Sequence, residues 1–411
     1  MGIVGPVPGV TQVGSRRVCL HIANAPDVPF CAAAGVTMDV VLARSTAPTA
    51  LAAERCSAYV AVGIGSLRAY SCSCARVTTP PAVSISARRQ SPPGYIGVVR
   101  DDFLLFAGSA SRKLGGAIAD YLDCPLGASE TLKFSEGNLF VRVIDNVRGR
   151  DVFLVQGTAF PANDNFMELL FWIDALKRAS AASVTAVIPY FSYAKGDKKD
   201  EPRVSIRARV CADAIEAAGV DRVITLDLHA PQVQGFFKVP VDDLYALPVL
   251  CDVIASKALP NLVVVAPDAG FAKKARQWSE RLNVPLAIAD KRRVDHSETA
   301  EVVELIGSVA GCTALIVDDF TISAGTLADA ARVLVEKGAD SVYATVTHGL
   351  LAGEAVSRID ESPIKRLFMT DSVETQPVAL SSKVEIVSVA GLFGEAIRRI
   401  ANRESVSGLF T

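Results

Sequence analysis

The sequence lacks several features that mark special classes of protein. No run of about 18 uninterrupted apolar residues is present, so the sequence predicts no membrane-spanning helix. Basic residues are not in excess, since 42 Lys and Arg stand against 44 Asp and Glu. A general nucleic-acid binder needs a basic face that neutralises phosphates. We therefore expect neither a nucleic acid nor a membrane as a partner.

The cysteine spacings of a zinc site or a disulfide scaffold are also missing. The nine cysteines are an odd number, and those in the first hundred residues follow no metal-site pattern. The other four, Cys124, Cys211, Cys251 and Cys312, occur singly in apolar patterns. We expect these four to be small buried side chains in a reducing compartment.

Residues 1–95 lack lysine, contain few acids and show no sustained period of 2 or 3.6. The first hundred residues hold nine Arg, no Lys and three acids, a net charge of +6, which leaves −8 for the rest of a chain whose net charge is −2. Abundant Ala, Ser, Val and Pro make this composition typical of an organelle transit peptide and linker. We expect a disordered leader, for a chloroplast in preference to a mitochondrion. An unusual N-terminal domain is the alternative.

From Phe103 onward, short apolar runs alternate with amphipathic segments of helical length. The predicted strands are 104–107, 152–155, 184–188, 223–226, 262–265, 286–289, 315–317 and 342–346, and the predicted helices are 111–122, 165–179, 204–218, 247–257, 271–282 and 327–337. This order predicts an α/β fold with largely parallel sheets and helices on both faces. Because the pattern starts again near residue 245, we predict two domains, 96–244 and 245–411.

In open parallel sheets, ligands bind beyond the carboxyl ends of the strands. One such end carries two carboxylates, Asp318 and Asp319, followed by a small, hydroxylated turn at Ser323–Thr326 that opens a helix. Backbone N–H groups at a helix start bind phosphate, and carboxylates accept hydrogen bonds from sugar hydroxyls. We interpret this segment as a cradle for a sugar phosphate. An ordinary strand-to-helix turn with a capping residue is the alternative.

Two other strand ends carry polar groups. Asp227 and His229 are two residues apart, which places both side chains on one face of the strand. Such a pair suits Mg²⁺, which uses few protein ligands and bridging phosphates. Asp268 and Gly270 form a second acidic strand-to-helix junction.

Basic residues also gather at the predicted ligand edge. Lys273 and Lys274 lie in a first helical turn, where cations oppose the helix dipole. Residues 193–203 and 290–293 are basic segments that we expect to be loops. In an otherwise acidic body, such loops suit a polyphosphate. Solvated surface charge is the alternative.

Several motifs, taken in order, resemble those of the ribose-phosphate pyrophosphokinases (phosphoribosyl pyrophosphate synthetases) over about residues 103–411. The similar segments are 163–170, 173–181, 187–190, 221–229, 234–237, 290–293, 318–326 and 404–410. The resemblance implies two tandem phosphoribosyltransferase-type (type I) domains. It also implies Mg²⁺-dependent transfer of the diphosphate of ATP to the 1-hydroxyl of ribose 5-phosphate. The implied assembly is a homo-oligomer or a hetero-oligomer with related subunits.

The resemblance assigns roles to residues of this sequence. It implies that Lys291 and Arg293 stabilise the transition state from a mobile loop. The implied metal ligands are Asp227, His229, Asp242 and Asp268. The implied ATP-binding residues are Phe134, Glu136, Lys195, Asp197, Lys198 and His229. Ribose 5-phosphate would be held by Asp268, Gly270, Asp318, Asp319, Ser323, Ala324, Gly325 and Thr326.

The chain departs from the family pattern at six positions that touch nucleotide, metal or sugar contacts. These are Glu136, Asn138, Lys195, Gly196, Lys238 and Ile322. An Arg-Gln pair that normally meets ATP is Lys195-Gly196 here, and Lys lacks the planar fork of Arg. A catalytically weak regulatory paralogue that associates with active subunits therefore stays open as an alternative. A nucleobase phosphoribosyltransferase would explain the Asp318–Thr326 segment but not the second α/β domain.

Overall fold

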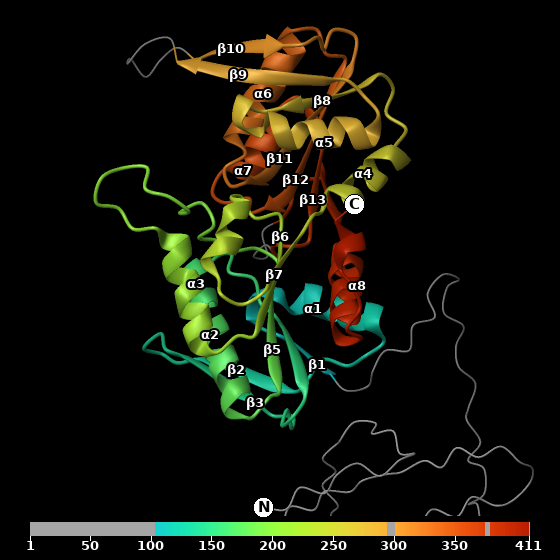
Figure 1. Ribbon diagram of the computed structural model, residues 1–411. Coiled ribbons are helices and arrows are strands. Elements are labelled where there is room, and N and C mark those ends of the chain that lie inside the picture. The colour runs from blue at the N-terminus through green and yellow to red at the C-terminus, as the bar shows by residue number, and fades with distance from the viewer. Residues whose placement is uncertain (1–102, 294–300, 375–378, 411) are drawn as a thin grey trace, which may run out of the picture. The chain divides into compact units, whose positions relative to one another are not determined.

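The computed structural model describes residues 103–293, 301–374 and 379–410 (Figure 1). The predicted leader, 1–95, and the start of the first predicted domain at residue 96 lie outside this described part. None of the helices in these ranges has the length and apolar character needed to span a membrane.

The first half of the described chain is built on a five-stranded parallel sheet. Its strands, in spatial order, are β1 (Phe103–Ala107), β4 (Asp151–Val155), β5 (Ser183–Ile188), β6 (Arg222–Leu226) and β7 (Val241–Leu244). Three helices connect them: α1 (Arg112–Leu122), α2 (Ala162–Arg178) and α3 (Arg207–Ala218). A separate antiparallel hairpin consists of β2 (Ser129–Lys133) and β3 (Leu139–Val143).

Strand β4 shows how the sequence covers both faces of this sheet. Its apolar run is buried throughout, as expected for a strand with helices on each side. Val152 and Leu154 belong to the core that includes α2 and α3, whereas Phe153 and Val155 belong to the core that includes α1. Successive side chains thus serve opposite faces. Figure 1 shows α2 and α3 on one side of the sheet and α1 on the other.

The second half contains a seven-stranded sheet. In spatial order its strands are β10 (Glu301–Ile306), β9 (Leu286–Arg293), β8 (Leu262–Ala266), β11 (Thr313–Thr321), β12 (Ser341–Gly349), β13 (Ile364–Thr370) and β14 (Val384–Val387). Only the β9–β10 pairing is antiparallel within this sheet. The helices of this half are α4 (Leu247–Ser256), α5 (Ala272–Leu282), α6 (Gly325–Glu336) and α7 (Ala355–Glu361). The predicted α/β class with parallel sheets is confirmed.

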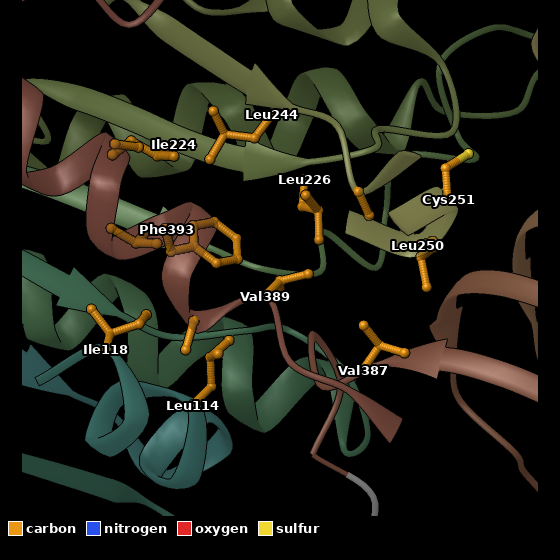
Figure 2. Packing of buried hydrophobic residues seen from close by; sticks show 14 of the residues in the cluster. Leu114, Ile118, Ile224, Leu226, Leu244, Leu250, Cys251, Val387, Val389 and Phe393 are labelled. Atoms are coloured by element: carbon orange, nitrogen blue, oxygen red, sulfur yellow. The ribbon is translucent and has the colours of Figure 1, made fainter. Parts of the chain in front are cut away.

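One hydrophobic core joins the two halves. It contains Leu114 and Ile118 of α1, Leu250 of α4 and Phe393 of the last helix, α8 (Ala390–Ala401) (Figure 2). Helix α8 packs beside α1, although almost 270 residues separate them in sequence. The end of the chain therefore helps to bury the first sheet.

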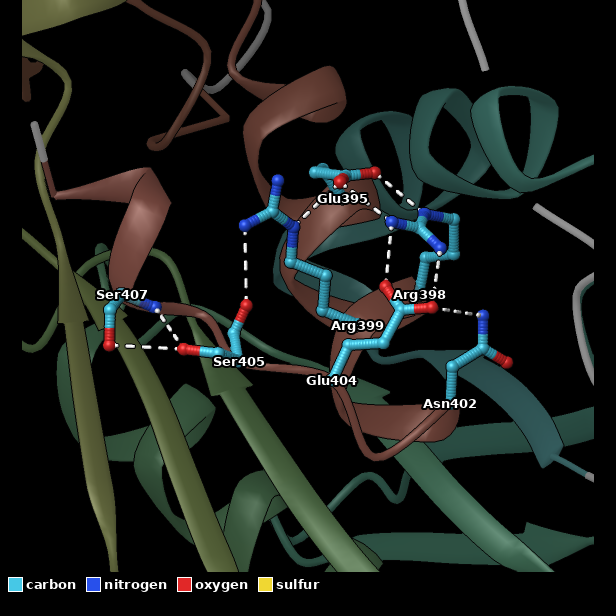
Figure 3. A network of polar contacts seen from close by, with 7 residues as sticks. All are labelled: Glu395, Arg398, Arg399, Asn402, Glu404, Ser405 and Ser407. Carbon is cyan, nitrogen blue, oxygen red and sulfur yellow. Dashed lines mark hydrogen bonds and ion pairs between the residues drawn. The ribbon is translucent and has the colours of Figure 1, made fainter. Parts of the chain in front are cut away.

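A polar network fastens the chain after α8 (Figure 3). Glu395 accepts hydrogen bonds from Arg398 and Arg399, and Arg398 also pairs with Glu404 at 3.0 Å. These contacts hold the turn that leads to Phe410, whose ring meets Tyr245 edge-on at 5.9 Å between centroids.

Two predicted strands are longer than their apolar runs. Strand β9 continues to Arg293, and β11 continues to Thr321. The segment 290–293, expected as a loop, is therefore strand, because it pairs with β10. Of the four cysteines expected to be buried, Cys211 and Cys251 are buried, and Cys124 and Cys312 are partly exposed.

Candidate active site

A cleft of about 1370 Å³ opens at the carboxyl ends of strands from both sheets. This is the edge at which parallel α/β sheets bind ligands. The cleft brings together predicted site residues from both halves. They are Lys195, Asp227, His229, Asp268, Gly270, Asp318, Asp319, Ser323, Ala324, Gly325 and Thr326.

Asp227 connects the first sheet to the second. Its backbone, directly after β6, has a φ of 42°, a left-handed conformation that is uncommon for a residue with a side chain. The carboxylate accepts hydrogen bonds from Thr347 Oγ1 at 2.7 Å and from the N–H of Ala246 at 3.0 Å. Burial raises the pKa of Asp227, and these two hydrogen bonds oppose the rise. One of its oxygens is thus committed to the protein.

A second contact across the halves joins His229 to Asp319. The distance from His229 Nδ1 to Asp319 Oδ2 is 2.8 Å, and Lys274 Nζ lies 3.5 Å from the same oxygen. Burial acts to raise the pKa of Asp319, but the hydrogen bond from His229 and the charge of Lys274 outweigh it and hold this pKa below its usual value. Asp319 is therefore an anion in the cleft.

Asp318 differs from its neighbour. Burial and the charge of Asp319 raise the pKa of Asp318 to about 8. Asp268 adds to the same repulsion. Repulsion from Asp319 and Asp268 thus adds to burial in disfavouring the ionised form of Asp318.

Mg²⁺ fits this donor set. The groups are carboxylate oxygens, which Mg²⁺ prefers, and a divalent cation would relieve their mutual repulsion. No group of three or more His, Cys, Asp or Glu in the described residues is arranged as a metal cage. That agrees with a cation held by one or two protein ligands together with substrate phosphates. Asp268 and the Nε2 atom of His229 are the groups that would hold it.

The start of α6 lies where the sequence predicts a phosphate cradle. Ala324, directly before the helix, has a φ of 56°, and no side chain caps the first turn. The N–H groups of that turn therefore remain available to a phosphate at the positive end of the helix dipole. Nearby, Asp268 accepts a hydrogen bond from the N–H of Phe271 at 2.9 Å and so fixes the turn that carries Gly270.

Lys195 reaches the cleft from the segment after β5. Its ammonium lies 3.6 Å from the centre of the Phe320 ring, a cation–π contact. Burial lowers the pKa of Lys195, against the opposing charges of Asp319 and Asp318. Asp197 and Lys198 line an adjoining hollow of about 560 Å³, where Gln232 donates to Asp197 and Lys198 pairs with Asp200 at 3.7 Å.

Three predicted ligand residues, Phe134, Glu136 and Asp242, line neither this cleft nor the adjoining hollow. Phe134 and Glu136 lie at the turn of the β2–β3 hairpin, where the Phe134 ring meets Phe140. Asp242 forms an ion pair with Arg222, so its carboxylate is occupied elsewhere. Its neighbour Asp243 points to the opposite face of β7 and accepts a hydrogen bond from the N–H of Leu228 at 3.1 Å.

Lys291 and Arg293 belong to β9, where their backbones pair with Val303 and Glu301 of β10. The expected mobile loop is replaced here by an antiparallel ladder. Four residues that the sequence did not single out also line the cleft, namely Thr347, Tyr245, Phe320 and Phe410. Of these four, only Phe320 could have been predicted to lie there, because it directly follows the paired acids in sequence.

Comparison with known proteins decides the family. The profile of the N-terminal domain of ribose phosphate pyrophosphokinase matches residues 103–219, and that of the phosphoribosyl synthetase-associated domain matches residues 294–411. A ribose-phosphate pyrophosphokinase of Agrobacterium fabrum is 49% identical over 308 residues, which are 74% of this chain and 99% of the relative. The chain belongs to the ribose-phosphate pyrophosphokinase family. The resemblance seen in the motifs is thus confirmed.

Other members of the family agree. A ribose-phosphate pyrophosphokinase of Hyphomonas neptunium is 50% identical over 309 residues, covering 74% of this chain and 99% of the relative. The crystal structure of the phosphoribosylpyrophosphate synthetase from Mycobacterium smegmatis superposes with a TM-score of 0.70 at 36% identity. The match covers 74% of this chain and 100% of that one. The family's fold therefore accounts for the described two-sheet body.

Proposed function

We propose that this chain is a ribose-phosphate diphosphokinase that serves nucleotide biosynthesis. In the reaction, the 1-hydroxyl oxygen of ribose 5-phosphate attacks the β-phosphorus of ATP. The bond from that phosphorus to the oxygen bridging the α-phosphate breaks, AMP leaves, and the hydroxyl proton is released. The products are 5-phosphoribosyl 1-diphosphate and AMP.

One observation carries the proposal. A single cleft holds an uncapped helix start, a pair of acids and a cationic side chain, contributed by both halves of the fold. The first turn of α6 would bind the 5-phosphate, and Asp318 and Asp319 would accept hydrogen bonds from ribose hydroxyls. Lys195, which lies against Phe320, would meet the phosphates of ATP. Because no covalent intermediate is needed, this positioning and charge balance would carry most of the rate.

Mg²⁺, when bound with ATP, would neutralise phosphate oxygens and orient the diphosphate. Asp268 and His229 would hold it at the acid-rich edge of the cleft. The anionic Asp319, kept ionised by His229 and Lys274, would fix the position of the imidazole that faces the metal.

The test is an assay of the full chain with ATP, Mg²⁺ and ribose 5-phosphate, in which AMP and 5-phosphoribosyl 1-diphosphate are both quantified. We expect equal amounts of the two products and none when ribose 5-phosphate is omitted. Asp318→Asn should lower turnover at least tenfold, whereas Asp329→Asn, on the exposed side of α6 beside Arg332, should not change it. Absence of AMP in the complete mixture would contradict the proposal.

A second candidate function is a catalytically weak regulatory paralogue. It is favoured by Ile322, which stands where the family pattern has an acid and packs with Leu350 and Val373 in an apolar cluster. Such a chain would bind active synthetase subunits and change their turnover without forming AMP alone.

We further propose that the protein is oligomeric, with copies of itself or with related subunits, and acts in an organelle, with a chloroplast preferred over a mitochondrion. The composition of residues 1–95 supports import. Fusion of these residues to a fluorescent reporter would test the destination. Sedimentation of the full chain would test the assembly.

A further inference from the structure

Gly196 leaves room for the side chain of Arg207, which lines the hollow beside the main cleft. A Cβ atom at position 196 would lie 2.7 Å from Nε and 2.8 Å from Cβ of Arg207. Real Cβ atoms do not approach other atoms this closely, so a side chain at 196 would displace Arg207. The same position carries Gln in the family pattern. In this chain, the guanidinium-bearing side chain of Arg207 occupies the space that a side chain at position 196 would need.

Arg207 has no other structural use in the described part of the chain. It is the first residue of α3, where a cation opposes the helix dipole. Its side chain is exposed and makes no ion pair or hydrogen bond with any described residue. Arg209, two residues later, is different, because it pairs with Asp213 at 2.8 Å. The guanidinium of Arg207 is therefore free to bind an anion from outside the chain.

The surroundings of Arg207 supply the rest of an anion site. Arg207 lines the 560 Å³ hollow together with Lys195, Lys198 and His229. The two carboxylates of this hollow are engaged, since Asp197 accepts from Gln232 and Asp200 pairs with Lys198. Lys195 and Arg207 therefore face the hollow without carboxylate partners in hydrogen-bond range among the described residues. The hollow joins the main cleft, because both are lined by Lys195, His229 and Phe320.

We propose that Arg207 is a nucleotide-binding residue that binds the phosphate chain of ATP. It supplies the planar guanidinium fork that Lys195 lacks, and it does so through the space left by Gly196. A guanidinium can bind phosphate oxygens through two parallel hydrogen bonds, whereas an ammonium acts as a point charge. This inference rests on the proposed function, because it takes ATP as the nucleotide of the cleft.

The test compares Arg207→Ala and Arg207→Lys with the full wild-type chain, using Arg209→Ala as the control from the same helix. We expect Arg207→Ala to raise the KM for ATP at least fivefold and to leave the KM for ribose 5-phosphate within twofold. Arg207→Lys should recover only part of the loss, and Arg209→Ala should match the wild type. A rise in the ATP KM below fivefold in Arg207→Ala overturns the inference.

Two further variants separate this role from a structural one. Gly196→Gln should weaken ATP binding at least threefold by displacing Arg207, without lowering the Tm of the ATP-free protein by more than about 2 °C. Lys195→Arg, added to Arg207→Ala, should restore at least half of the lost ATP affinity. Unchanged ATP binding in Gly196→Gln would overturn the inference.

Failure of the proposed function is recognised separately. If the wild-type chain forms no AMP, the shift in Tm caused by ATP and Mg²⁺ alone becomes the readout. A shift present in the wild type and Arg209→Ala but lost in Arg207→Ala supports the role of Arg207 without the reaction. An equal shift in Arg207→Ala, or no shift in the wild type, overturns it.

Discussion

His229 and Asp319 lie 90 residues apart in sequence, yet their Nδ1 and Oδ2 atoms are 2.8 Å apart. One follows β6 of the first sheet, and the other belongs to β11 of the second. The contact fixes the imidazole at the mouth of the cleft and keeps Asp319 ionised. The proposed site is therefore complete only when both halves are in place.

Replacement of His229 by Ala should raise the pKa of Asp319, because burial then acts with less opposition. We expect turnover to fall at least tenfold, since the cleft loses both a metal-facing nitrogen and an orienting contact. Steady-state kinetics measures the first effect, and NMR titration of the carboxyl group measures the second. Unaltered turnover would mean that His229 is not part of the proposed site.

Lys291→Ala and Arg293→Ala should each lower turnover more than tenfold with little change in stability. The resemblance assigns these residues to the developing phosphate charge, and their backbone positions in β9 are kept by the ladder with β10. Lys337→Ala, at the C-terminal end of α6, is a distant control. Thermal unfolding and turnover, measured together, distinguish a catalytic loss from unfolding. Near-normal turnover in both variants would show that this strand is not catalytic.

Ile322 is partly buried, packing against an apolar cluster and also lining the cleft. Ile322→Asp should destabilise the fold by roughly 1–3 kcal/mol, because a carboxylate would replace apolar contacts with that cluster. Ile322→Val, which keeps the apolar character, should cost less than about 1.5 kcal/mol. Urea unfolding of both variants gives the comparison. Equal stability of the two would indicate that the Asp side chain lies wholly in the cleft, which residue 322 also lines.

His348 should make the protein less stable in acid. Burial holds the pKa of His348 at about 4, against the opposing charge of Asp319, while the unfolded value is near 6.5. Between these values the unfolded chain binds a proton that the folded chain does not, so the free energy of unfolding falls as pH decreases. The slope approaches about 1.4 kcal/mol per pH unit, and above pH 6.5 the effect is absent.

The control for this pH dependence is His348→Gln, which cannot titrate. Urea unfolding between pH 4.5 and 7.5 should show a smaller loss of stability in this variant than in the wild type. Parallel curves would assign the acid sensitivity to other groups.

The sequence predicted the ligand edge of the site because a general rule applies there. Acids and a small turn after a buried strand must lie at the carboxyl edge, and Asp318, Asp319 and Ser323–Thr326 lie there. Hydrophobic periodicity does not indicate how far a strand continues into polar residues. Residues 290–293 of β9 are strand because β10 pairs with them, which is a non-local cause.

The resemblance implied Asp242 as a metal ligand and gave no role to Asp243. Successive residues of a strand face opposite sides of the sheet, so one of these two aspartates must face the core. The register of β7 decides which one, and the sequence does not show that register. The structure turns Asp243 inward, where burial raises its pKa to about 7. The packing of α8 on α1 could not be predicted either, because no local sequence pattern connects two helices so far apart in sequence.

The fastening of the last residues by Glu395, Arg398 and Arg399 has a practical consequence. It keeps Phe410 on the wall of the cleft, beside Tyr245. An affinity tag or fluorescent protein joined after residue 411 would begin next to Phe410, on the wall of the proposed substrate cleft. Such fusions should be checked by substrate affinity, and the exposed C-terminal part of α6, at Glu336 and Lys337, is a safer position for a label.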